Sequence, residues 1–341
     1  MKVLFQAYNT CCQTESGGVQ VRIRKIKQLL ENRGIQVDFF STFNTKIKDY
    51  DVLHIFSLKE ESLGVASTAK KLGLKVVIST IVNTTEWRAK AIRNTLLFPH
   101  VLRCLGIEPI EYQRYEILQL CDCIFVESKT EADFISKYYK VDSNKIKIVP
   151  NGVDQQPSAS KSIYERINPN RKYVLQVGRV DSNKNTLNTI KAVKGADYDL
   201  VIIGGKFAGA TDHYYEKCIK EAEDMPNVHF LGWLDPKSDM LASAYQNSQA
   251  VIMPSKSETF GLVAVEAAMA GTHVCLSNNL AILDFGVFKR DFTFNSSNPK
   301  DIRRVLDKAM NTPKDNTVKE LAQKVFSWDK IIDEHINTYK C

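Results

Sequence analysis

Residues 255–271 read SKSETFGLVAVEAAMAG, and the rest of the chain can be interpreted outward from them. An apolar run of strand length, residues 249–254, comes directly before this stretch, and an Ala-rich run with helix-forming composition follows Gly261. The pattern predicts a strand, a loop and a helix, with Gly261 at the turn into the helix. The free N–H groups and the positive dipole end at such a helix start can face an anion.

Two glutamates lie in this stretch, eight positions apart. Glu258 belongs to the predicted loop, and Glu266 lies on the predicted helix, about one turn from its start. Ionised carboxylates accept hydrogen bonds, so the pair suits a ligand with many hydroxyl groups. The alternative is a buried helix that happens to carry two glutamates, although a buried carboxylate is costly unless it has a partner.

The same residues resemble the E-x7-E donor-site signature of retaining family 4 glycosyltransferases. Seven residues separate Glu258 from Glu266, and the words FGL and EAAMAG accompany them. The resemblance covers nearly the whole chain and implies an α/β protein with two Rossmann-like, doubly wound domains facing a cleft, the GT-B arrangement. It implies a catalytic role for Glu258, which would hold sugar hydroxyls. It places these further residues at the donor: Thr259, Phe260, Gly261, Leu262 and Glu266.

Two cations follow another predicted strand, in residues 171–185, which read RKYVLQVGRVDSNKN. Arg179 can bind two phosphate oxygens at once, and Lys184, five positions on, supplies a point charge. Such cations suit a departing nucleoside diphosphate, because negative charge builds on it as the glycosidic bond breaks. The segment resembles the family's G-R-x(4)-K-[GN] element, which implies that Arg179 and Lys184 are catalytic residues. Taken alone, they could be two solvated surface cations.

Glycine corners follow several other predicted strands. Gly17 and Gly18 come after the first strand, and Gly204 comes after the strand at 200–203. Glycines at a strand-to-helix corner let backbone N–H groups approach a phosphate, although most such glycines only form turns. The resemblance implies that these three glycines contact the donor and that Leu234 borders the nucleotide base. A G-x-G-x-x-G motif follows none of these strands, which argues against a dinucleotide dehydrogenase.

Short apolar runs alternate with helical segments in the first part of the chain, which predicts a parallel doubly wound sheet with ligands at the carboxyl ends of its strands. Family members often carry a His after the strand equivalent to 76–80, but residues 81–86 here read IVNTTE. Asn83 and Glu86 are therefore acceptor-side candidates, together with His54. His54 could instead be a hydrogen-bonded histidine at a strand end. Strands are predicted at 1–8, 35–40, 52–56, 76–80, 123–126 and 146–149.

The words VPNGVD at residues 149–154 end the first predicted domain, as they do in the family. We expect an N-terminal acceptor-side domain over 1–156, a linker rich in Ser, Pro and Asn over 157–170, and a nucleotide-sugar-binding domain over 171–325. An amphipathic helix at 326–341 is expected to cross back onto the first domain, because family members end in this way.

The 341 residues suit two domains, and 44% apolar with 25% charged residues is ordinary for a globular enzyme. Eight scattered Cys without a secretory signal indicate a cytoplasmic protein, and no apolar stretch reaches membrane-spanning length. The net charge of +7 suits nucleotides or an anionic membrane surface. Residues 88–105, with four basic and no acidic residues, could lie on a membrane or cover the first domain's core.

These observations indicate a retaining glycosyltransferase that moves a hexose-type sugar from a nucleoside diphosphate sugar to a saccharide or lipid-linked saccharide. No metal is expected, because the two D-x-D words at 49–51 and 197–199 come before their strands rather than after them. No cofactor and no nucleic-acid partner are expected either. The alternatives are a non-catalytic nucleotide-sugar-binding protein or transferase subunit, and a glycoside hydrolase with two carboxylates. Several sugars, bases, acceptors and oligomeric states are compatible with the pattern.

Overall fold

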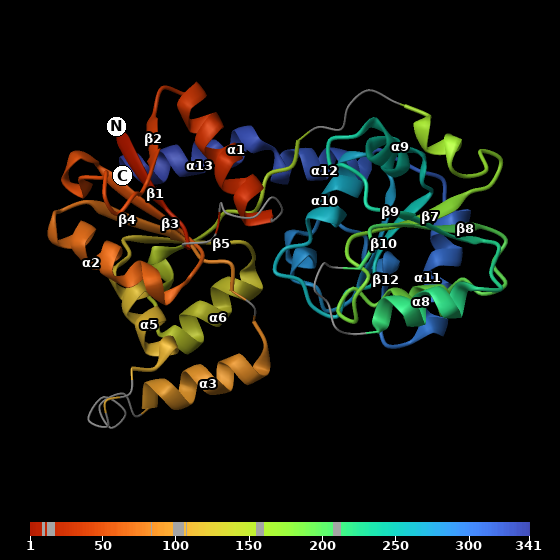
Figure 1. The fold of residues 1–341 in the computed structure, drawn as a ribbon, viewed down its shortest axis with the longest axis horizontal. Helices are drawn as coiled ribbons and strands as arrows, with labels where there is room; N and C mark the ends of the chain where they lie inside the picture. The colour runs from red at the N-terminus through yellow and green to blue at the C-terminus, as the bar shows by residue number, and fades with distance from the viewer. Residues whose placement is uncertain are drawn as a thin grey trace. The chain divides into compact units, whose positions relative to one another are not determined.

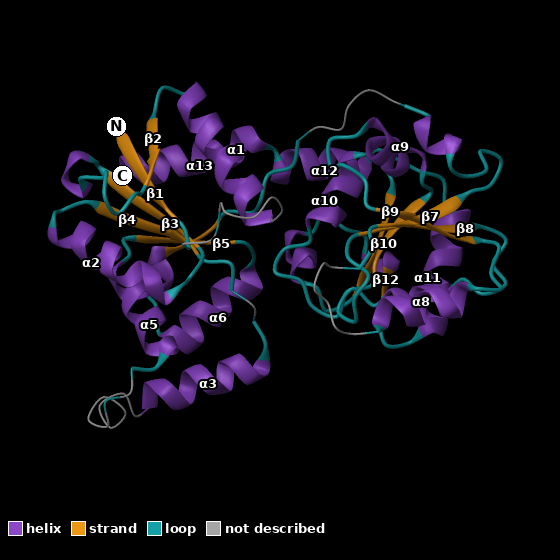
Figure 2. Cartoon of the chain, in the orientation of Figure 1, coloured by secondary structure: helices purple, strands orange, loops and turns teal. Residues whose placement is uncertain are grey.

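The computed structural model describes residues 1–8, 11, 18–82, 84–97, 106, 108–154, 160–206 and 213–341. These residues form two compact units (Figure 1). Unit 1 consists of Met1–Gly152 and Trp328–Cys341, and unit 2 consists of Val153–Ser327. Each unit contains a six-stranded sheet with helices on both faces (Figure 2), which confirms the prediction of two doubly wound, Rossmann-like domains.

The sheet of unit 1 has the order β2-β1-β3-β4-β5-β6, and every neighbouring pair is parallel. Its central strands are buried along their whole length, as expected for strands covered on both faces. Each strand predicted from the sequence is present within a few residues. The strands are β1 (Lys2–Gln6), β2 (Gln36–Phe39), β3 (Val52–Phe56), β4 (Lys75–Ser79), β5 (Cys123–Val126) and β6 (Ile146–Ile148).

Helices cover both faces of this sheet. Buried side chains of α2, α3, α5 and α6 pack on one face, and those of α1 and α13 pack on the other. The helices are α1 (Gly18–Asn32), α2 (Leu63–Lys71), α3 (Glu86–Leu97), α5 (Ile110–Leu120), α6 (Lys129–Tyr139) and α13 (Trp328–Lys340). Short 3-10 helices are η1 (Ile47–Asp49), η2 (Glu60–Ser62) and η3 (Ser143–Lys145).

Helix α13 belongs to the core of unit 1 although it is the last helix of the chain. Ile331, Ile332 and Tyr339 are buried beside residues of β1 and α1. On the surface, Arg33 of α1 forms ion pairs with Asp329 at 3.0 Å and with Asp333 at 2.9 Å. The structure therefore confirms the prediction that a C-terminal helix returns to the first domain.

The sheet of unit 2 has the order β12-β11-β10-β7-β8-β9, again with parallel neighbours. The strand order reverses between β7 and β10, because β8 and β9 lie beyond β7 while β11 and β12 lie beyond β10. The sequence did not predict β11 and β12. The strands are β7 (Tyr173–Val177), β8 (Asp199–Ile203), β9 (Val228–Gly232), β10 (Ala250–Met253), β11 (His273–Ser277) and β12 (Thr293–Phe294).

Two apolar cores, one on each face, also hold unit 2 together. Helices α9, α10 and α12 pack on one face of the sheet, and α7, α8 and α11 pack on the other. The helices are α7 (Thr186–Ala192), α8 (Tyr214–Ala222), α9 (Asp239–Asn247), α10 (Leu262–Met269), α11 (Pro299–Asn311) and α12 (Thr317–Phe326). Short 3-10 helices are η4 (Ser162–Glu165), η5 (Ala281–Phe285) and η6 (Arg290–Phe292).

The predicted linker at 157–170 is wrong for residues 160–170. Ile163 and Ile167 are buried in the core of unit 2, and the backbone N–H of Ile163 donates to Ser243 Oγ at 3.1 Å. The segment resembled a linker because most of its residues are polar, although Ile163 and Ile167 are buried apolar residues. The boundary between the units falls after Gly152, and residues 155–159 lie outside the described residues.

Gly152 offers a test of the packing in unit 1, because a Cβ placed there would collide with the indole ring of Trp328. We expect overpacking in Gly152→Ala to cost about 1–3 kcal/mol of folding free energy and to lower the melting temperature by about 2–12 °C. Gly64→Ala is the matched control, because Gly64 lies in α2 with open space around it. Differential scanning calorimetry should show an unchanged or slightly higher melting temperature for this control. Equal melting temperatures for the two variants would contradict the close packing of Gly152 against Trp328.

Candidate functional site

The candidate site lies at the carboxyl ends of β7 and β10 in unit 2. In open parallel sheets, ligands bind at the carboxyl edge where the strand order reverses, because the two loops there lead to opposite faces. In unit 2 these are the loop at 178–185, after β7, and the loop at 254–261, after β10. They carry the predicted catalytic residues Arg179, Lys184 and Glu258.

The loop after β7 is shaped by Asp181, whose side chain caps the turn. Its Oδ1 accepts hydrogen bonds from the backbone N–H of Asn183 at 3.0 Å and of Lys184 at 2.8 Å. Asn185 then adopts the left-handed conformation with φ of 56° and precedes α7. Short polar side chains tolerate such turns, because they can hydrogen-bond to nearby backbone groups. The turn fixes the backbone from which the Lys184 side chain projects.

Backbone and side-chain contacts fasten this loop to the loop after β10. The Nδ2 of Asn183 donates to the carbonyl of Ser257 at 2.9 Å, and the N–H of Lys256 donates to the carbonyl of Asn183 at 2.9 Å. Next to these bonds, Lys184 Nζ lies 2.5 Å from Glu258 Oε1. The two side chains are 19% and 14% exposed, so the ion pair is only partly screened by water.

Two of the three predicted catalytic residues therefore meet. Because Glu258 neutralises Lys184, a second anion near this ammonium group would share it with the carboxylate. Arg179 lies in the same loop, and its Nε is 3.4 Å from Asp181 Oδ2. The Arg179 side chain is about half exposed.

Gly178 and Gly204 form two corners that touch each other. Both have φ of 132°, which L side chains rarely adopt. The N–H of Gly178 donates to the carbonyl of Ile203 at 2.9 Å, and a Cβ on Gly204 would overlap the carbonyl of Gly178. Close backbone packing thus accounts for these glycines, and a contact of Gly204 with a ligand stays a prediction.

Helix α10 begins at a left-handed glycine, as the sequence predicted. Gly261 has φ of 104°, and a Cβ there would come within 2.9 Å of Met253 Cε. Thr259 is exposed and Leu262 is partly buried. The side chain of Phe260 is buried in the core beside Phe326, so only its backbone could face a ligand, and its predicted donor contact stays a prediction.

Glu266 projects from α10 and accepts a hydrogen bond from the hydroxyl of Tyr245, with an O–O distance of 2.5 Å. Burial raises the pKa of Glu266, and the Tyr245 hydroxyl opposes this shift because it stabilises the carboxylate. Tyr245 is itself buried in α9. Sequence reasoning missed Tyr245, although a glutamate in an apolar helix requires a donor and this tyrosine lies in the helix just before β10.

The loop after β9 carries Leu234, which packs against the apolar core of unit 2. Its neighbour Trp233, which we did not single out from the sequence, is exposed. A Cβ on Gly205 would lie 3.0 Å from the indole Nε1 of Trp233, so the ring lies against the corner after β8. Trp233 could have been singled out from the sequence, because it is an aromatic residue directly after a predicted strand, where ligands bind in parallel sheets.

The acceptor-side candidates of unit 1 have different outcomes. His54 is fully buried, and its Nδ1 and Nε2 lie 2.5 Å from Tyr339 Oη and 2.9 Å from Ser79 Oγ. Burial lowers the pKa of His54 well below its ordinary value, so the acceptor-side prediction for His54 is wrong. Glu86 is exposed at the start of α3. Gly17 and Asn83 lie outside the described residues, and Gly18 begins α1.

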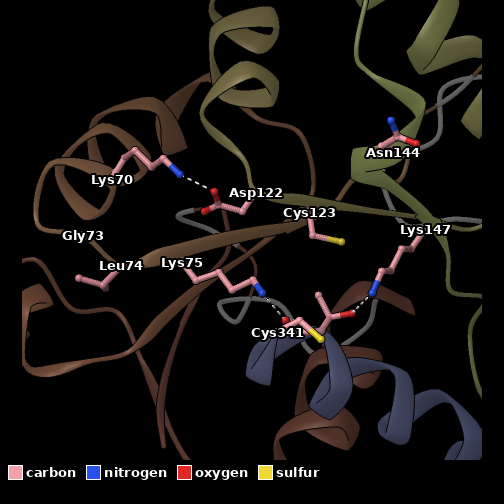
Figure 3. Close-up of a pocket in the computed structure, with 10 residues that line it drawn as sticks. Lys70, Gly73, Leu74, Lys75, Asp122, Cys123, Asn144, Lys147 and Cys341 are labelled. Atoms are coloured by element: carbon pink, nitrogen blue, oxygen red, sulfur yellow. Dashed lines mark hydrogen bonds and ion pairs between the residues drawn. The ribbon is translucent and has the colours of Figure 1, made fainter.

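A cavity of about 500 Å³ opens at the opposite edge of the unit 1 sheet, near the amino ends of β4 to β6 (Figure 3). Lys75 Nζ donates to the carbonyl of Thr338 at 2.6 Å, and Lys147 Nζ donates to Thr338 Oγ1 at 3.0 Å. Lysines in this position stabilise the carboxyl end of α13, which has the negative end of the helix dipole. Helix capping explains this basic cluster, and we assign it no ligand.

The second aspartate of each D-x-D word has structural partners. Asp51 Oδ2 accepts from the N–H of Lys2 at 2.7 Å, and Asp199 pairs with Arg171 at 2.8 Å and with His229 at 3.0 Å. Among the described residues, no group of three or more His, Cys, Asp and Glu side chains could hold a metal ion. In that same part of the chain, every helix is too short or too polar to cross a membrane.

Comparison with a solved structure shows the fold. HepE from Anabaena, solved in complex with UDP, matches this structure with a TM-score of 0.75 at 15% sequence identity, over 100% of both chains. The two Rossmann-like units are those of the GT-B fold. Family models match as well: glycosyl transferases group 1 over residues 160–325 and glycosyltransferase family 4 over residues 43–156. The chain belongs to the glycosyltransferases of this group 1 and family 4 type.

Sequence relatives extend over different shares of the chain. An uncharacterized 41.2 kDa protein in the cps region of Klebsiella pneumoniae is 27% identical over 325 residues, 86% of this chain and 80% of that protein. The O-antigen chain mannosyltransferase RfbU of Salmonella typhimurium is 28% identical over 223 residues, 61% of this chain and 60% of that protein.

Replacing Tyr245 with Phe tests the contact with Glu266. Because the folded-state pKa of Glu266 is raised, its ionisation lowers stability as pH rises, and Tyr245 offsets part of that loss. Tyr245→Phe should therefore lower the melting temperature by about 4–8 °C at pH 8 and by about half as much at pH 5. Tyr173→Phe is the control, since Tyr173 donates to the neutral carbonyl of Ala244 at 2.7 Å. An equal decrease in the melting temperature of Tyr245→Phe at pH 5 and pH 8 would contradict the contact with an ionised Glu266.

Proposed function

We propose that this protein is a retaining hexosyltransferase that moves a sugar from a nucleoside diphosphate sugar to a saccharide or lipid-linked saccharide in the biosynthesis of a glycan or polysaccharide. The observation that carries the proposal is the Lys184 and Glu258 pair at the reversal of strand order in unit 2. Anabaena HepE, which shares the fold, was solved with UDP and with UDP-glucose. The cps-region and O-antigen relatives support the glycan context.

In the proposed reaction, Arg179 and Lys184 stabilise the diphosphate as it leaves. Negative charge accumulates on its oxygens, and preorganised cations stabilise that charge more than the neutral starting bond. The N–H groups at the start of α10, after Gly261, add partial positive charge. We assign this role to protein cations and propose that no metal or cofactor is needed.

The two glutamates would hold the donor by its hydroxyl groups. Glu258 would accept from the sugar hydroxyls while its Lys184 partner turns toward the diphosphate, and Glu266 would accept from the ribose. The acceptor hydroxyl would pass its proton to the leaving phosphate oxygen on the same face, which retains the configuration of the anomeric carbon. No enzyme nucleophile is required by this scheme.

A thermal-shift screen with UDP-glucose, UDP-galactose and GDP-mannose tests the donor class. A donor at 100 times its dissociation constant stabilises a protein by about 2.7 kcal/mol, so one sugar nucleotide should raise the melting temperature clearly. Arg179→Ala and Lys184→Ala should each lower transfer or donor hydrolysis by about 100-fold. The control is Arg304→Ala, an exposed cation of α11. Turnover near the wild-type rate in both site variants would remove the roles given to these cations.

The alternative of a non-catalytic donor-binding subunit is favoured by one observation, the segment IVNTTE at 81–86, where the family resemblance leads us to expect a His. In that case the screen would show donor binding without transfer or hydrolysis. Donor binding with turnover supports the enzyme, and turnover that needs no nucleotide would instead indicate a glycoside hydrolase.

We also propose a peripheral membrane contact through α3. Its buried residues Ala89 and Ile92 pack on the core, while Trp87, 72% exposed, and Leu97 face outward with two exposed cations, Lys90 and Arg93. An apolar and basic surface of this kind suits an anionic bilayer. The remainder of the predicted stretch, residues 98–105, lies outside the described residues.

Vesicle flotation tests this contact. The wild type should float with vesicles that contain about a third anionic lipid and stay in solution with neutral vesicles, because each surface cation contributes about 1 kcal/mol near an anionic surface. The double variant Lys90→Ala with Trp87→Ala should bind at least about tenfold more weakly. Equal binding of the variant and the wild type would place any membrane contact elsewhere.

A further inference from the structure

The carboxyl ends of β3 and β4 carry two residues with an unusual backbone for their type. Ser57 follows β3 with φ of 75°, and Ile81 follows β4 with φ of 59°. A β-branched residue in the left-handed region is a strained outlier, because its Cβ lies too close to the next carbonyl. Such strain persists only where the surrounding structure enforces it, and it concentrates at functional sites. A neighbouring group must therefore hold Ile81.

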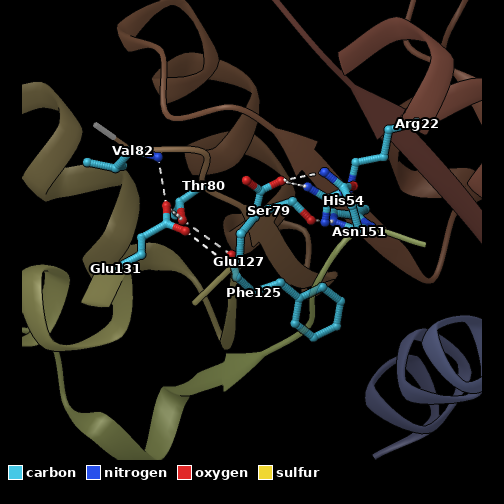
Figure 4. Close-up of polar contacts among 9 residues, drawn as sticks. All are labelled: Arg22, His54, Ser79, Thr80, Val82, Phe125, Glu127, Glu131 and Asn151. Atoms are coloured by element: carbon cyan, nitrogen blue, oxygen red, sulfur yellow. Dashed lines mark hydrogen bonds and ion pairs between the residues drawn. The ribbon is translucent and has the colours of Figure 1, made fainter. Parts of the chain in front are cut away.

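Glu131 of α6 is such a group, because its carboxylate contacts the residues on both sides of Ile81 (Figure 4). Glu131 Oε1 accepts from Thr80 Oγ1 at 2.7 Å and from the backbone N–H of Val82 at 2.7 Å. The other oxygen, Oε2, accepts from the N–H of Glu127 at 2.7 Å. One carboxylate thus joins the turn after β4 to the end of β5.

The start of α6 accounts for only part of this arrangement. Ser128 is the N-cap, and its Oγ accepts from the N–H of Glu131 at 3.1 Å, as in a capping box. A capping box would direct the glutamate side chain back to the N–H of the capping residue. Here the side chain instead bonds to Glu127 and reaches across to Thr80 and Val82. Completing the helix does not require those last two contacts.

Keeping a carboxylate here is costly. Glu131 is 3% exposed, and a second buried carboxylate, Glu127, lies next to it. Arg22 pairs with Glu127, and Asn151 Nδ2 donates to it at 2.9 Å, while no cation pairs with Glu131 in the part of the chain that the structure describes. Burial and the charge of Glu127 raise the pKa of Glu131 to about 7. The two carboxylate oxygens of Glu131 accept hydrogen bonds from three donors, the Thr80 hydroxyl and the N–H groups of Val82 and Glu127.

We infer that Glu131 is a positioning residue that fixes the strained turn at Thr80 to Val82, and that this turn orients the acceptor on unit 1. The inference rests on the proposed function and on the expectation from the sequence that the first domain is the acceptor-side domain. Sheets of this type bind ligands at the carboxyl edge of the strands, and α3 begins at Glu86, four positions after Val82. Glu131 acts through the backbone of the turn and does not itself touch the substrate.

The test compares Glu131→Gln and Glu131→Asp with the control Asp133→Asn, which changes an exposed carboxylate of the same helix. Gln keeps the size but replaces one accepting oxygen with an NH2 group, which faces an N–H donor in either orientation. Asp keeps the charge but is one methylene too short to reach the turn. Three measurements are made on the full chain: hydrogen exchange of the peptide containing 80–82, affinity for the donor found in the thermal-shift screen, and transfer to p-nitrophenyl hexosides as acceptor probes.

Both Glu131 variants should exchange hydrogen at 80–82 about tenfold faster and show an acceptor KM about tenfold higher, while donor affinity stays within about twofold. Asp133→Asn should match the wild type. Unchanged exchange at 80–82 would overturn the inference, and so would equal losses of donor and acceptor affinity or a loss of stability with wild-type kinetics.

The proposed function can fail separately from this inference. If the wild type binds no nucleoside diphosphate sugar, the proposed function is wrong, and acceptor positioning is overturned with it, whatever the exchange shows. If the wild type binds a donor but uses only water as acceptor, donor hydrolysis replaces transfer. In that case, faster hydrogen exchange at 80–82 with an unchanged rate of donor hydrolysis in the Glu131 variants supports the inference, because water does not have to be oriented by the turn. Slower donor hydrolysis in these variants overturns it.

Discussion

The ion pair of Lys184 and Glu258 joins two loops that are 74 residues apart in the chain. Parallel strands end at one edge of the sheet, so the loops after β7 and β10 begin side by side and then lead to opposite faces. The hydrogen bonds of Asn183 to the 256–257 backbone hold these loops together whether or not the pair is formed. The cation can therefore exchange partners without disturbing the loops that carry it. Our functional proposal depends on this division of roles: the hydrogen bonds of Asn183 hold the two loops together, and the ammonium group of Lys184 binds the anion.

Three buried or partly buried glutamates are stabilised in three different ways. Glu127 has a guanidinium partner, Glu266 has a tyrosine hydroxyl, and Glu131 has two N–H groups and a threonine hydroxyl. Only the first arrangement neutralises the charge, and burial raises the pKa of all three carboxyls. Carboxylates that depend on dipoles alone are the more informative ones, because they are buried without a cation to offset the cost of desolvation. Both of them lie near a carboxyl edge where a ligand is expected.

Local patterns predicted most of the architecture. Alternating apolar runs gave the strands of unit 1, and the spacing of Lys184 and Glu258 relative to their strands placed both at one edge. What could not be predicted depends on tertiary packing. His54 has the same sequence context whether its ring faces a ligand or the hydroxyl of Tyr339, which is 285 residues away. Tyr245 and Glu131 likewise owe their roles to neighbours from other elements, and the linker composition of 157–170 concealed the anchors Ile163 and Ile167.

The return of α13 to unit 1 has a consequence for how the protein is made. A ribosome releases the strands of unit 1 early, but Ile331, Ile332 and Tyr339, which close one face of that sheet, are synthesised after the whole of unit 2. Unit 2 is contiguous and can fold as soon as it emerges, so it can be complete while unit 1 still exposes apolar surface. The order of folding during translation is then opposite to the order of the units in the chain. Nascent unit 1 would be the natural client of chaperones during this interval.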